Sequence, residues 1–273
     1  MIKNIMTVDL EDYFCNLPMT QWENYESRIV KTTMHILDLF EKHKVQATFF
    51  TIGKIAESHP ELIENIVKRG HEISSHGYSH TDIRKMNRSS FEEDLQKSLA
   101  ILKKISGENI LGFRAPYFSV TKENFWIFDV LKKYLKYDSS IFPVRTPLYG
   151  IPDAPRSIYR LSEKNPLEND NTGNFFEIPL ATLRLSYFGN LPVAGGFYLR
   201  FLPLWIIKTG IKKLNKSRFP AVCFIHPHDL DPEKPRIIGY SWRAYWGLKG
   251  ATKKFESLLS TFSFSSVREI LLH

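Results

Sequence analysis

The sequence predicts an α/β fold built around a parallel sheet. Short segments rich in apolar, β-branched and aromatic residues alternate with segments whose apolar residues recur at helical spacing. This alternation is typical of right-handed βαβ units. The chain has 273 residues, a length that α/β barrels commonly reach as one domain, and no internal repeat or linker divides it. We therefore expect a single domain over residues 1–273.

The first half of the chain contains four expected strands, and helices follow the first three. The first strand is a short apolar run suited to burial in a parallel sheet. Two of the helices are expected to begin at capping boxes, Ser58 with Glu61 and Ser89 with Glu92, and to end near glycine. The expected strands are residues 2–8, 45–52, 72–75 and 110–113, and the expected helices are 29–40, 62–67 and 91–102.

The second half of the chain is less regular. Residues 142–175 contain five prolines and several Asn and Asp residues, and they predict a long irregular segment. Loops of that length inside a domain tend to be functional or mobile. The regular elements expected here are helices at 124–133, 198–215 and 244–261, and strands at 175–183, 221–225 and 262–267.

The composition is that of an ordinary globular protein with a basic excess. There are 37 Lys and Arg against 29 Asp and Glu, which gives a net charge of +8. No nucleic-acid recognition motif accompanies this charge, so a nucleic-acid partner is not expected. The densest basic cluster, residues 208–218, lies on an expected helix beside the apolar residues 201–207. It is a solvated helix face, or it holds the protein near an anionic membrane or a lipid-diphosphate-linked glycan.

The N-terminal residues resemble a first strand rather than a signal peptide, because acidic residues begin at Asp9. The most apolar later stretch, residues 197–207, is interrupted by Arg200 and Pro203 and is too short to span a membrane. We therefore expect a cytoplasmic protein.

Polar residues with catalytic potential follow four of the expected strands. In parallel α/β sheets the carboxyl ends of the strands meet at one edge, where chemistry gathers. These side chains should therefore converge on one site. They are Asp9, Glu11 and Asp12 after the first strand, His76 and His80 after the third, Arg114 after the fourth, and His226 and His228 after residues 221–225.

The two histidines at 76 and 80 are four residues apart, which on a helical turn would place both on one face. Alone they are equally typical of surface or capping histidines. A carboxylate from the neighbouring strand end would complete a His₂–carboxylate set of the kind that binds catalytic zinc. The sequence therefore predicts a metal site here.

The remaining groups predict acid–base chemistry. A carboxylate of the Asp9 cluster would serve as a base beside the metal, although acidic residues are also favoured at helix N-termini. His226 suits a general acid because its ordinary pKa of about 6.5 permits proton donation near neutrality, and a buried structural histidine is the alternative. Arg114 precedes a proline that ends the strand, and it would either orient the catalytic carboxylate or close a salt bridge.

Five segments in the same order resemble the motifs of polysaccharide deacetylases, the NodB-homology enzymes of carbohydrate esterase family four. The resemblance spans roughly residues 3–270. Residues 177–182, 191–200 and 262–270 further resemble the subgroup associated with exosortase and exopolysaccharide loci. The five segments are residues 7–14, 47–53, 70–80, 113–117 and 224–231.

The resemblance implies a distorted (β/α)7-type barrel that binds a divalent metal, usually zinc. It implies that Asp9 is the catalytic base, that His76 and His80 bind the metal, and that Arg114 orients the base. His226 would be the general acid. The implied reaction is attack of metal-activated water on an acetamide carbonyl, so we expect removal of N-acetyl groups from an amino sugar of a cell-surface polysaccharide, an exopolysaccharide or its precursor.

The chain departs from the family pattern at one position. Most members have two adjacent aspartates, but Leu10 follows Asp9 here, so the carboxylate ligand is Glu11 or Asp12, with Asp12 slightly favoured. Substrate contacts are expected at Tyr117, His228 and Arg200, with Gly195, Gly196 and Tyr198 nearby. The alternative functions are a small-amide or cyclic-ureide hydrolase on the same fold, and a non-catalytic carbohydrate-binding relative.

Overall fold

The computed structural model describes residues 2–185 and 189–272, and it contains one main sheet of nine strands. All neighbouring pairs in this sheet are parallel except the last, in which β6 runs antiparallel to β7. The expected parallel α/β fold is therefore confirmed. In spatial order the strands are β10 (Val222–Ile225), β1 (Asn4–Leu10), β2 (Thr48–Thr51), β3 (Glu72–Ser75), β4 (Gly112–Phe113), β5 (Tyr137–Asp138), β7 (Phe176–Glu177) and β6 (Tyr159–Arg160), and β11 (Phe264–Ser265) pairs with the start of β1.

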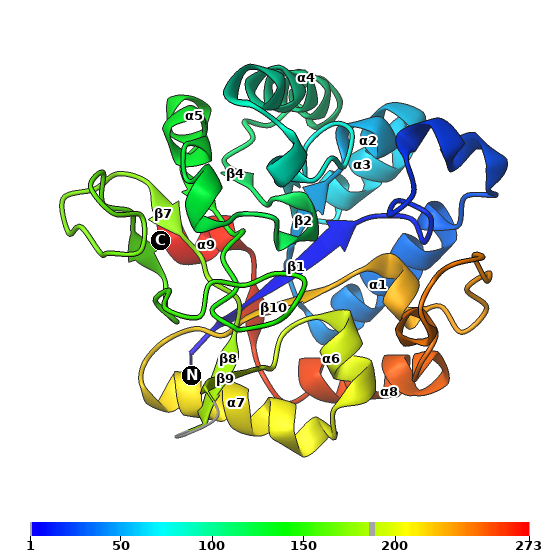
Figure 1. Cartoon of the computed structure of the whole chain (residues 1–273). Helices are drawn as coiled ribbons and strands as arrows, with labels where there is room; N and C mark the ends of the chain where they lie inside the picture. Colours follow the sequence, from blue (N-terminus) through cyan, green and yellow to red (C-terminus); the bar gives the residue numbers. More distant parts are fainter. Residues whose placement is uncertain (1, 186–188, 273) are drawn as a thin grey trace.

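The sheet curls into a half-barrel with helices around it (Figure 1). β1 runs through the middle, strands pair with it on both sides, and every residue of this strand is buried. Ala181 N donates to Val222 O, which places the segment after β7 alongside β10. The helices are α1 (Ile29–His43), α2 (Gly53–Ser58), α3 (Pro60–Lys68), α4 (Arg88–Ser106), α5 (Ile127–Tyr134), α6 (Gly196–Phe201), α7 (Leu204–Lys216), α8 (Leu248–Leu259) and α9 (Val267–Leu272).

The two expected capping boxes are wrong. Ser58 is the last residue of α2, and α3 begins at Pro60, which needs no cap on its own nitrogen because proline lacks an N–H. At α4 the N-cap is Asn87, two residues before Ser89, and its side chain accepts a hydrogen bond from Ser90 N. Asparagine is as good an N-cap as serine, so the earlier position is used.

Proline explains two other differences. The expected strand at 175–183 is divided into β7 in the main sheet and β8 (Thr182–Leu185), which pairs with β9 (Gly189–Pro192) in a separate hairpin, because Pro179 lies between them and cannot donate a ladder bond. The expected helix at 198–215 is likewise two helices, since Pro203 separates α6 from α7. The strand β5 and the terminal helix α9 are additional elements that the periodicity does not predict.

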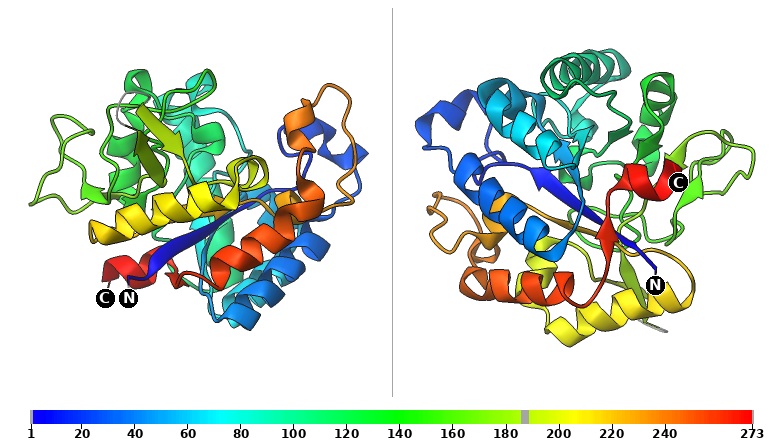
Figure 2. Two further views of the ribbon diagram at one scale, coloured as in Figure 1. Left: turned by 90° about the horizontal axis from the view of Figure 1, so that it is seen from below. Right: turned by 180° about the vertical axis from the view of Figure 1, so that it is seen from behind.

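Seen from below and from behind, the long helices lie around the outside of the main sheet (Figure 2). The carboxyl ends of β1, β3, β4 and β10 reach one end of the half-barrel, since these strands are parallel. No helix within the described residues combines the length and apolar character needed to cross a bilayer.

Candidate active site

The polar groups that follow the strands surround one cavity of about 300 Å³. Most of them are buried, and they come from segments far apart in the chain. Of the expected site residues, Asp12, Arg114 and Arg200 do not line the cavity wall. Those that line it are Asp9, Glu11, His76, His80, Tyr117, His226 and His228, together with Tyr149, Phe197 and Tyr198 from the second half of the chain.

Glu11, His76 and His80 form a buried group whose ligand atoms all lie within 4.8 Å of one another. Glu11 Oε1 is 3.0 Å from Nε2 of both His76 and His80. Burial alone would raise the pKa of Glu11, but His80, His226 and His76 hold it well below its usual value. Glu11 is therefore an ionised carboxylate facing two imidazoles.

The outer nitrogens of the two imidazoles are fixed by the backbone. His76 Nδ1 donates to Arg114 O at 2.7 Å, and His80 Nδ1 donates to Cys15 O at 2.9 Å. A carbonyl oxygen only accepts, so Nδ1 of each ring carries a proton and Nε2 of each ring faces Glu11, with His76 Nε2 at hydrogen-bond distance from Oε1. This is the arrangement that histidine ligands of metals show.

The group fits a divalent cation. His80 Nε2 is buried and, within residues 2–185 and 189–272, makes no hydrogen bond of acceptable geometry, although Glu11 Oε1 is 3.0 Å away. Two lone pairs beside a carboxylate repel one another unless a proton or a cation lies between them. Two imidazole nitrogens and one carboxylate oxygen are the ligand set of catalytic zinc sites with an open position.

The two histidines are brought together by a loop and not by a helical turn, so that part of the expectation is wrong. The chain between them is irregular, and Gly77 and His80 both have positive φ. Asp94 on α4 holds the loop by accepting hydrogen bonds from the backbone nitrogens of Tyr78, at 2.7 Å, and Ser79, at 3.2 Å.

The Asp12 carboxylate serves a different purpose. Oδ2 accepts hydrogen bonds from the backbone nitrogens of Arg28 and Ile29, at 2.9 and 3.1 Å, and from the Ser27 hydroxyl at 2.7 Å. Its other oxygen accepts from Tyr13 N. Asp12 therefore holds the N-terminus of α1, and Glu11 is the carboxylate directed at the histidines.

Asp9 is paired with Arg114 in the interior. Arg114 Nη1 donates to Asp9 Oδ1 at 2.5 Å, and Arg114 is completely buried. The guanidinium also donates to Thr7, to Ser139 O and to the Ser139 hydroxyl, and it lies over the ring of Phe50. Asp9 Oδ2 is free of these contacts and lies 3.9 Å from His226 Nε2.

His226 is oriented by a carboxylate that the sequence analysis did not assign. Asp229 Oδ2 lies 2.9 Å from His226 Nδ1, and Arg200 Nε donates to Asp229 Oδ1 at 3.1 Å. Burial lowers the pKa of His226, but Glu11, Asp229 and Asp9 overcome this and raise it to about 9. The available signal was the spacing, since Asp229 is three residues after His226.

The three expected substrate-binding residues lie in different surroundings. Tyr117 and His228 are at the cavity wall, where the Tyr117 ring is 4.6 Å from that of His80 and the His228 ring stacks on His226 at 4.9 Å. Burial, Lys234 and His226 hold the pKa of His228 well below its usual value, so this ring is neutral. Arg200 is buried behind Asp229 and also donates to Arg243 O and Trp246 O.

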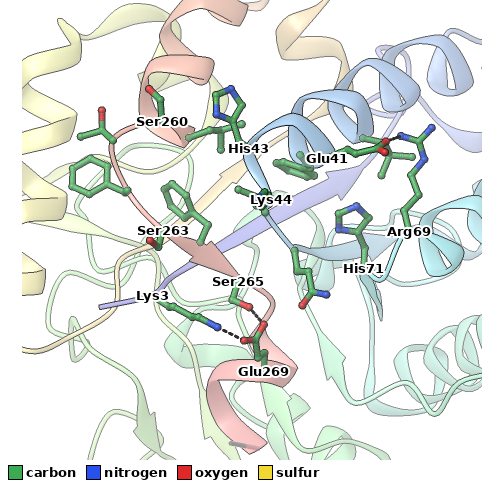
Figure 3. A pocket seen from close by; sticks show the side chains of 18 of the residues that line it. Lys3, Glu41, His43, Lys44, Arg69, His71, Ser260, Ser263, Ser265 and Glu269 are labelled. Atoms are coloured by element: carbon green, nitrogen blue, oxygen red, sulfur yellow. Dashed lines mark hydrogen bonds and ion pairs between the residues drawn. The ribbon is translucent and has the colours of Figure 1, made fainter. Parts of the chain in front are cut away.

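A larger cavity of about 1170 Å³ lies at the opposite, amino-terminal ends of the strands (Figure 3). Its polar wall includes Lys3, Lys44 and His71, and Glu269 contacts Lys3 and Ser265 there. None of the expected site residues reaches it. The catalytic potential therefore lies in the smaller cavity, where the titratable groups converge.

Two family models match adjacent parts of the chain. Residues 22–134 match a model described as polysaccharide deacetylase, and residues 139–272 match one described as a domain of unknown function, DUF3473. A peptidoglycan deacetylase of Helicobacter pylori is 35% identical over 204 residues, which are 71% of this chain and 60% of that protein. The chain spans less than two thirds of the length of the first curated relatives that it matches.

Solved structures with the same fold include a protein from Mycobacterium smegmatis described as a polysaccharide deacetylase. Its TM-score is 0.61 at 17% identity, with 98% of this chain and 89% of that chain covered. The PuuE allantoinase has a TM-score of 0.57 at 16% identity, with 97% and 87% of the two chains covered. At these identities the similarity shows the fold, and it agrees with the curled half-barrel described above.

Proposed function

The chain carries a polysaccharide deacetylase domain of the NodB, carbohydrate esterase family four, type, and from this premise we propose that it is a metal-dependent N-deacetylase. The substrate would be an N-acetylated amino sugar, and the products would be acetate and the free amine. One observation carries the proposal: a carboxylate with two oriented imidazoles lies beside Asp9 and His226 in a single cavity.

Glu11, His76 and His80 would hold the metal, and we propose zinc because the donor set is one carboxylate and two imidazoles. When bound, such a cation polarises the amide carbonyl, activates water and stabilises the negative charge that develops on the carbonyl oxygen. Glu11 is preferred over Asp12 because the Asp12 carboxylate already accepts several hydrogen bonds at the start of α1.

Asp9 would be the general base. Arg114 holds one carboxylate oxygen, Oδ1, and so fixes the direction of the other, Oδ2, which faces the cavity side near His226. Oδ2 would accept the proton of the attacking water as the new carbon–oxygen bond forms. Because Arg114 is buried and bonded to Ser139 and Thr7, the carboxylate cannot rotate freely.

His226 would be the general acid. Its Nδ1 is bonded to Asp229, which leaves Nε2 directed towards Asp9 and Glu11. The raised pKa keeps the ring protonated near neutrality. The ring would donate this proton to the amide nitrogen as the carbon–nitrogen bond breaks, so the amine leaves neutral.

Tyr117 and His228 would contact the sugar, since both line the cavity. Arg200 would act indirectly, through Asp229. The relative from Helicobacter pylori is named for action on peptidoglycan, and a relative from Sinorhizobium fredii for action on chitooligosaccharide. We propose a substrate of this chemical class: a glycan, or its lipid-linked precursor, bearing N-acetyl groups, in an exopolysaccharide or on the cell surface.

We also propose that the two matched segments form one domain. β7 lies in the second segment and pairs with β5, while β10, also in the second, pairs with β1, which precedes the first. The cavity takes His76 from the first segment and His226 from the second. Neither segment alone would contain all the groups that the proposed reaction needs.

Acetate release from a panel of N-acetylated oligosaccharides tests the function. Activity should disappear with a chelator and return with added zinc. Asp9→Asn should abolish turnover while retaining bound metal, whereas His76→Ala should lose both, and the exposed His35→Ala is the matched control. Full activity in the metal-free protein would refute the proposal, and ring opening of cyclic ureides without acetate release would identify the alternative hydrolase.

A further inference from the structure

The positive charge of the chain is concentrated in one segment. Residues 178–228 contain seven basic residues and no Asp or Glu, so the remaining 30 basic and 29 acidic residues nearly cancel. The net charge of +8 therefore comes almost entirely from these 51 residues. Four of the seven, Lys212, Lys213, Lys216 and Arg218, are exposed on or just after α7.

Helix α7 has one buried and one exposed face. Trp205, Thr209, Lys212 and Lys216 are spaced by four, three and four residues, and this spacing places them along one line of the helix. The core-facing residues Ile207, Gly210, Ile211 and Leu214 lie on the other side. α7 lies at the lower edge of the molecule in Figure 1 and in the right view of Figure 2, and in the left view, seen from below, no other helix lies in front of it.

The exposed face combines large aromatic side chains with unpaired lysines. Trp205 is 68% exposed, and Phe201, at the end of α6, is 49% exposed. Within residues 2–185 and 189–272, no carboxylate forms an ion pair with Lys212, Lys213 or Lys216. By contrast, several lysines elsewhere on the surface have acidic partners, as Lys31 and Lys133 do.

We propose that this surface, comprising Phe201, Trp205, Lys212, Lys213 and Lys216, docks the protein on an anionic membrane. Tryptophan and phenylalanine side chains insert at the boundary between headgroups and acyl chains, and lysines alongside them attract anionic headgroups. A merely solvated helix face would not require an exposed tryptophan. A glycan-binding face would require several uncharged hydrogen-bonding partners for sugar hydroxyls, and the line from Trp205 to Lys216 offers two, the indole N–H of Trp205 and the partly exposed hydroxyl of Thr209.

The docking surface is continuous with the wall of the catalytic cavity. Phe197 lines the cavity and stacks on Phe201 with ring centroids 5.5 Å apart. α6 therefore runs from the cavity at Gly196 to the exposed Phe201, and the exposed Trp205 follows at the start of α7. Docking would bring the cavity close to the headgroups. This position favours a lipid-linked glycan as substrate, an inference that rests on the proposed function.

Vesicle co-sedimentation tests the docking itself and does not depend on activity. The purified protein should bind vesicles of phosphatidylcholine with 30 mol% phosphatidylglycerol, bind pure phosphatidylcholine far less, and dissociate as salt is raised. Replacing Lys212, Lys213 and Lys216 by Ala should weaken binding on the order of 100-fold, from roughly fivefold per lysine. Trp205→Ser should also weaken vesicle binding, and this loss should be of similar size at low and at high salt.

The matched control replaces Lys44, Lys103 and Lys104, three exposed lysines outside this surface, by Ala. This variant should bind as the unmodified protein does. An equal loss in the control would show that net charge alone is responsible and would overturn the proposal. Absence of vesicle binding would also overturn the proposal. If the protein then bound soluble glycan polymers, and Trp205→Ser abolished that binding, the surface would be a glycan-binding face.

Discussion

Glu11 and Asp12 are neighbours in the chain, yet among the residues that the structure describes their carboxylates share no hydrogen-bond or ion-pair partner. Glu11 Oε1 lies 3.0 Å from Nε2 of His76 and of His80, whereas Asp12 binds the backbone at the start of α1 and the Ser27 hydroxyl. The two residues follow β1 where the chain leaves the sheet, so one side chain can face the cavity while the next caps a helix. Each assignment predicts a different consequence of removing the charge.

Glu11→Gln should lower zinc affinity at least about 100-fold, because loss of a direct ligand should exceed the 10–100-fold cost of losing a supporting partner. Its melting temperature without metal should change little. Asp12→Asn should keep zinc but lose about 1 to 3 kcal/mol of stability, because backbone N–H groups at the start of α1 lose a charged acceptor. Metal analysis after dialysis and thermal melts measure both effects, and the opposite result would make Asp12 the ligand.

The buried pair of Asp9 and Arg114 predicts strong energetic coupling. Arg114→Met leaves the Asp9 carboxylate buried without its partner, and breaking a buried pair in this way costs about 3 to 5 kcal/mol. Asp9→Asn combined with Arg114→Met should cost less than the sum of the single changes. Urea unfolding of the four proteins in excess chelator measures the coupling without a contribution from metal.

The exposed pair of Lys122 and Asp153 provides the comparison for this cycle. The same two changes there should show far smaller coupling, because solvent screens exposed charges. Coupling at Asp9 and Arg114 no larger than that of the exposed pair would mean that the guanidinium is held by Thr7 and Ser139 alone.

The buried His71 should make the stability of the folded protein sensitive to acid, independently of catalysis. The ring is buried between Phe40 and Phe49, and its Nδ1 accepts a hydrogen bond from Ala47 N. Burial, with a smaller effect of Arg69, lowers its pKa to about 4. The unfolded chain takes up a proton below pH of about 6.5, but the folded chain does so only near 4, so stability falls as pH decreases between these values.

The loss from this one group should reach about 3 kcal/mol, since each unit of pKa difference corresponds to about 1.4 kcal/mol. His71→Gln keeps an acceptor for Ala47 N but cannot titrate, so its stability should fall less between pH 6.5 and 4 than that of the unmodified protein. Denaturant unfolding across this range measures the difference, and the exposed His35→Gln should retain the full acid sensitivity. Parallel curves for His71→Gln and the unmodified protein would contradict the prediction.

The strand–helix alternation and the polar residues at the strand ends predicted the fold class and the convergence of Asp9, His76, His80 and His226. This succeeded because parallel strands bring their carboxyl ends together whatever the loops do. The direction of each side chain could not be predicted in the same way. Glu11 and Asp12 have the same chemistry, and only the positions of α1 and of the histidine loop determine which of them faces the cavity.

The contact of Asp229 with His226 was not predicted, for a related reason. Asp229 lies within the short helix Pro227–Leu230 after β10. An acidic residue in the first turn of a helix is explained equally well by its favourable interaction with the helix N-terminus. The other side-chain partner of Asp229 in the described part of the chain is Arg200, which is 29 residues earlier and donates to it from α6. Such a contact is set by how α6 packs, and no local pattern contains that information.

Gly196→Ala tests whether that packing supports catalysis. A Cβ at Gly196 would lie 1.7 Å from Asp229 Oδ2 and 2.1 Å from its Cγ, so Asp229 must move away. Asp229 Oδ2 contacts both the backbone nitrogen and Nδ1 of His226, so its displacement frees the ring. We expect kcat/KM for acetate release to fall at least about 100-fold, the lower end of what general acid–base catalysis contributes.

Gly250→Ala is the matched control, because Gly250 is an exposed position in α8 with open space where the Cβ would be. This change should leave kcat/KM unaltered and raise stability by about 0.5 to 1 kcal/mol through helix propensity. Asp229→Asn should lower kcat/KM as much as Gly196→Ala does. It should also change the alkaline limb of the plot of kcat/KM against pH. If Gly196→Ala is fully active, or if it is inactive while Asp229→Asn is not, then Asp229 does not position the general acid.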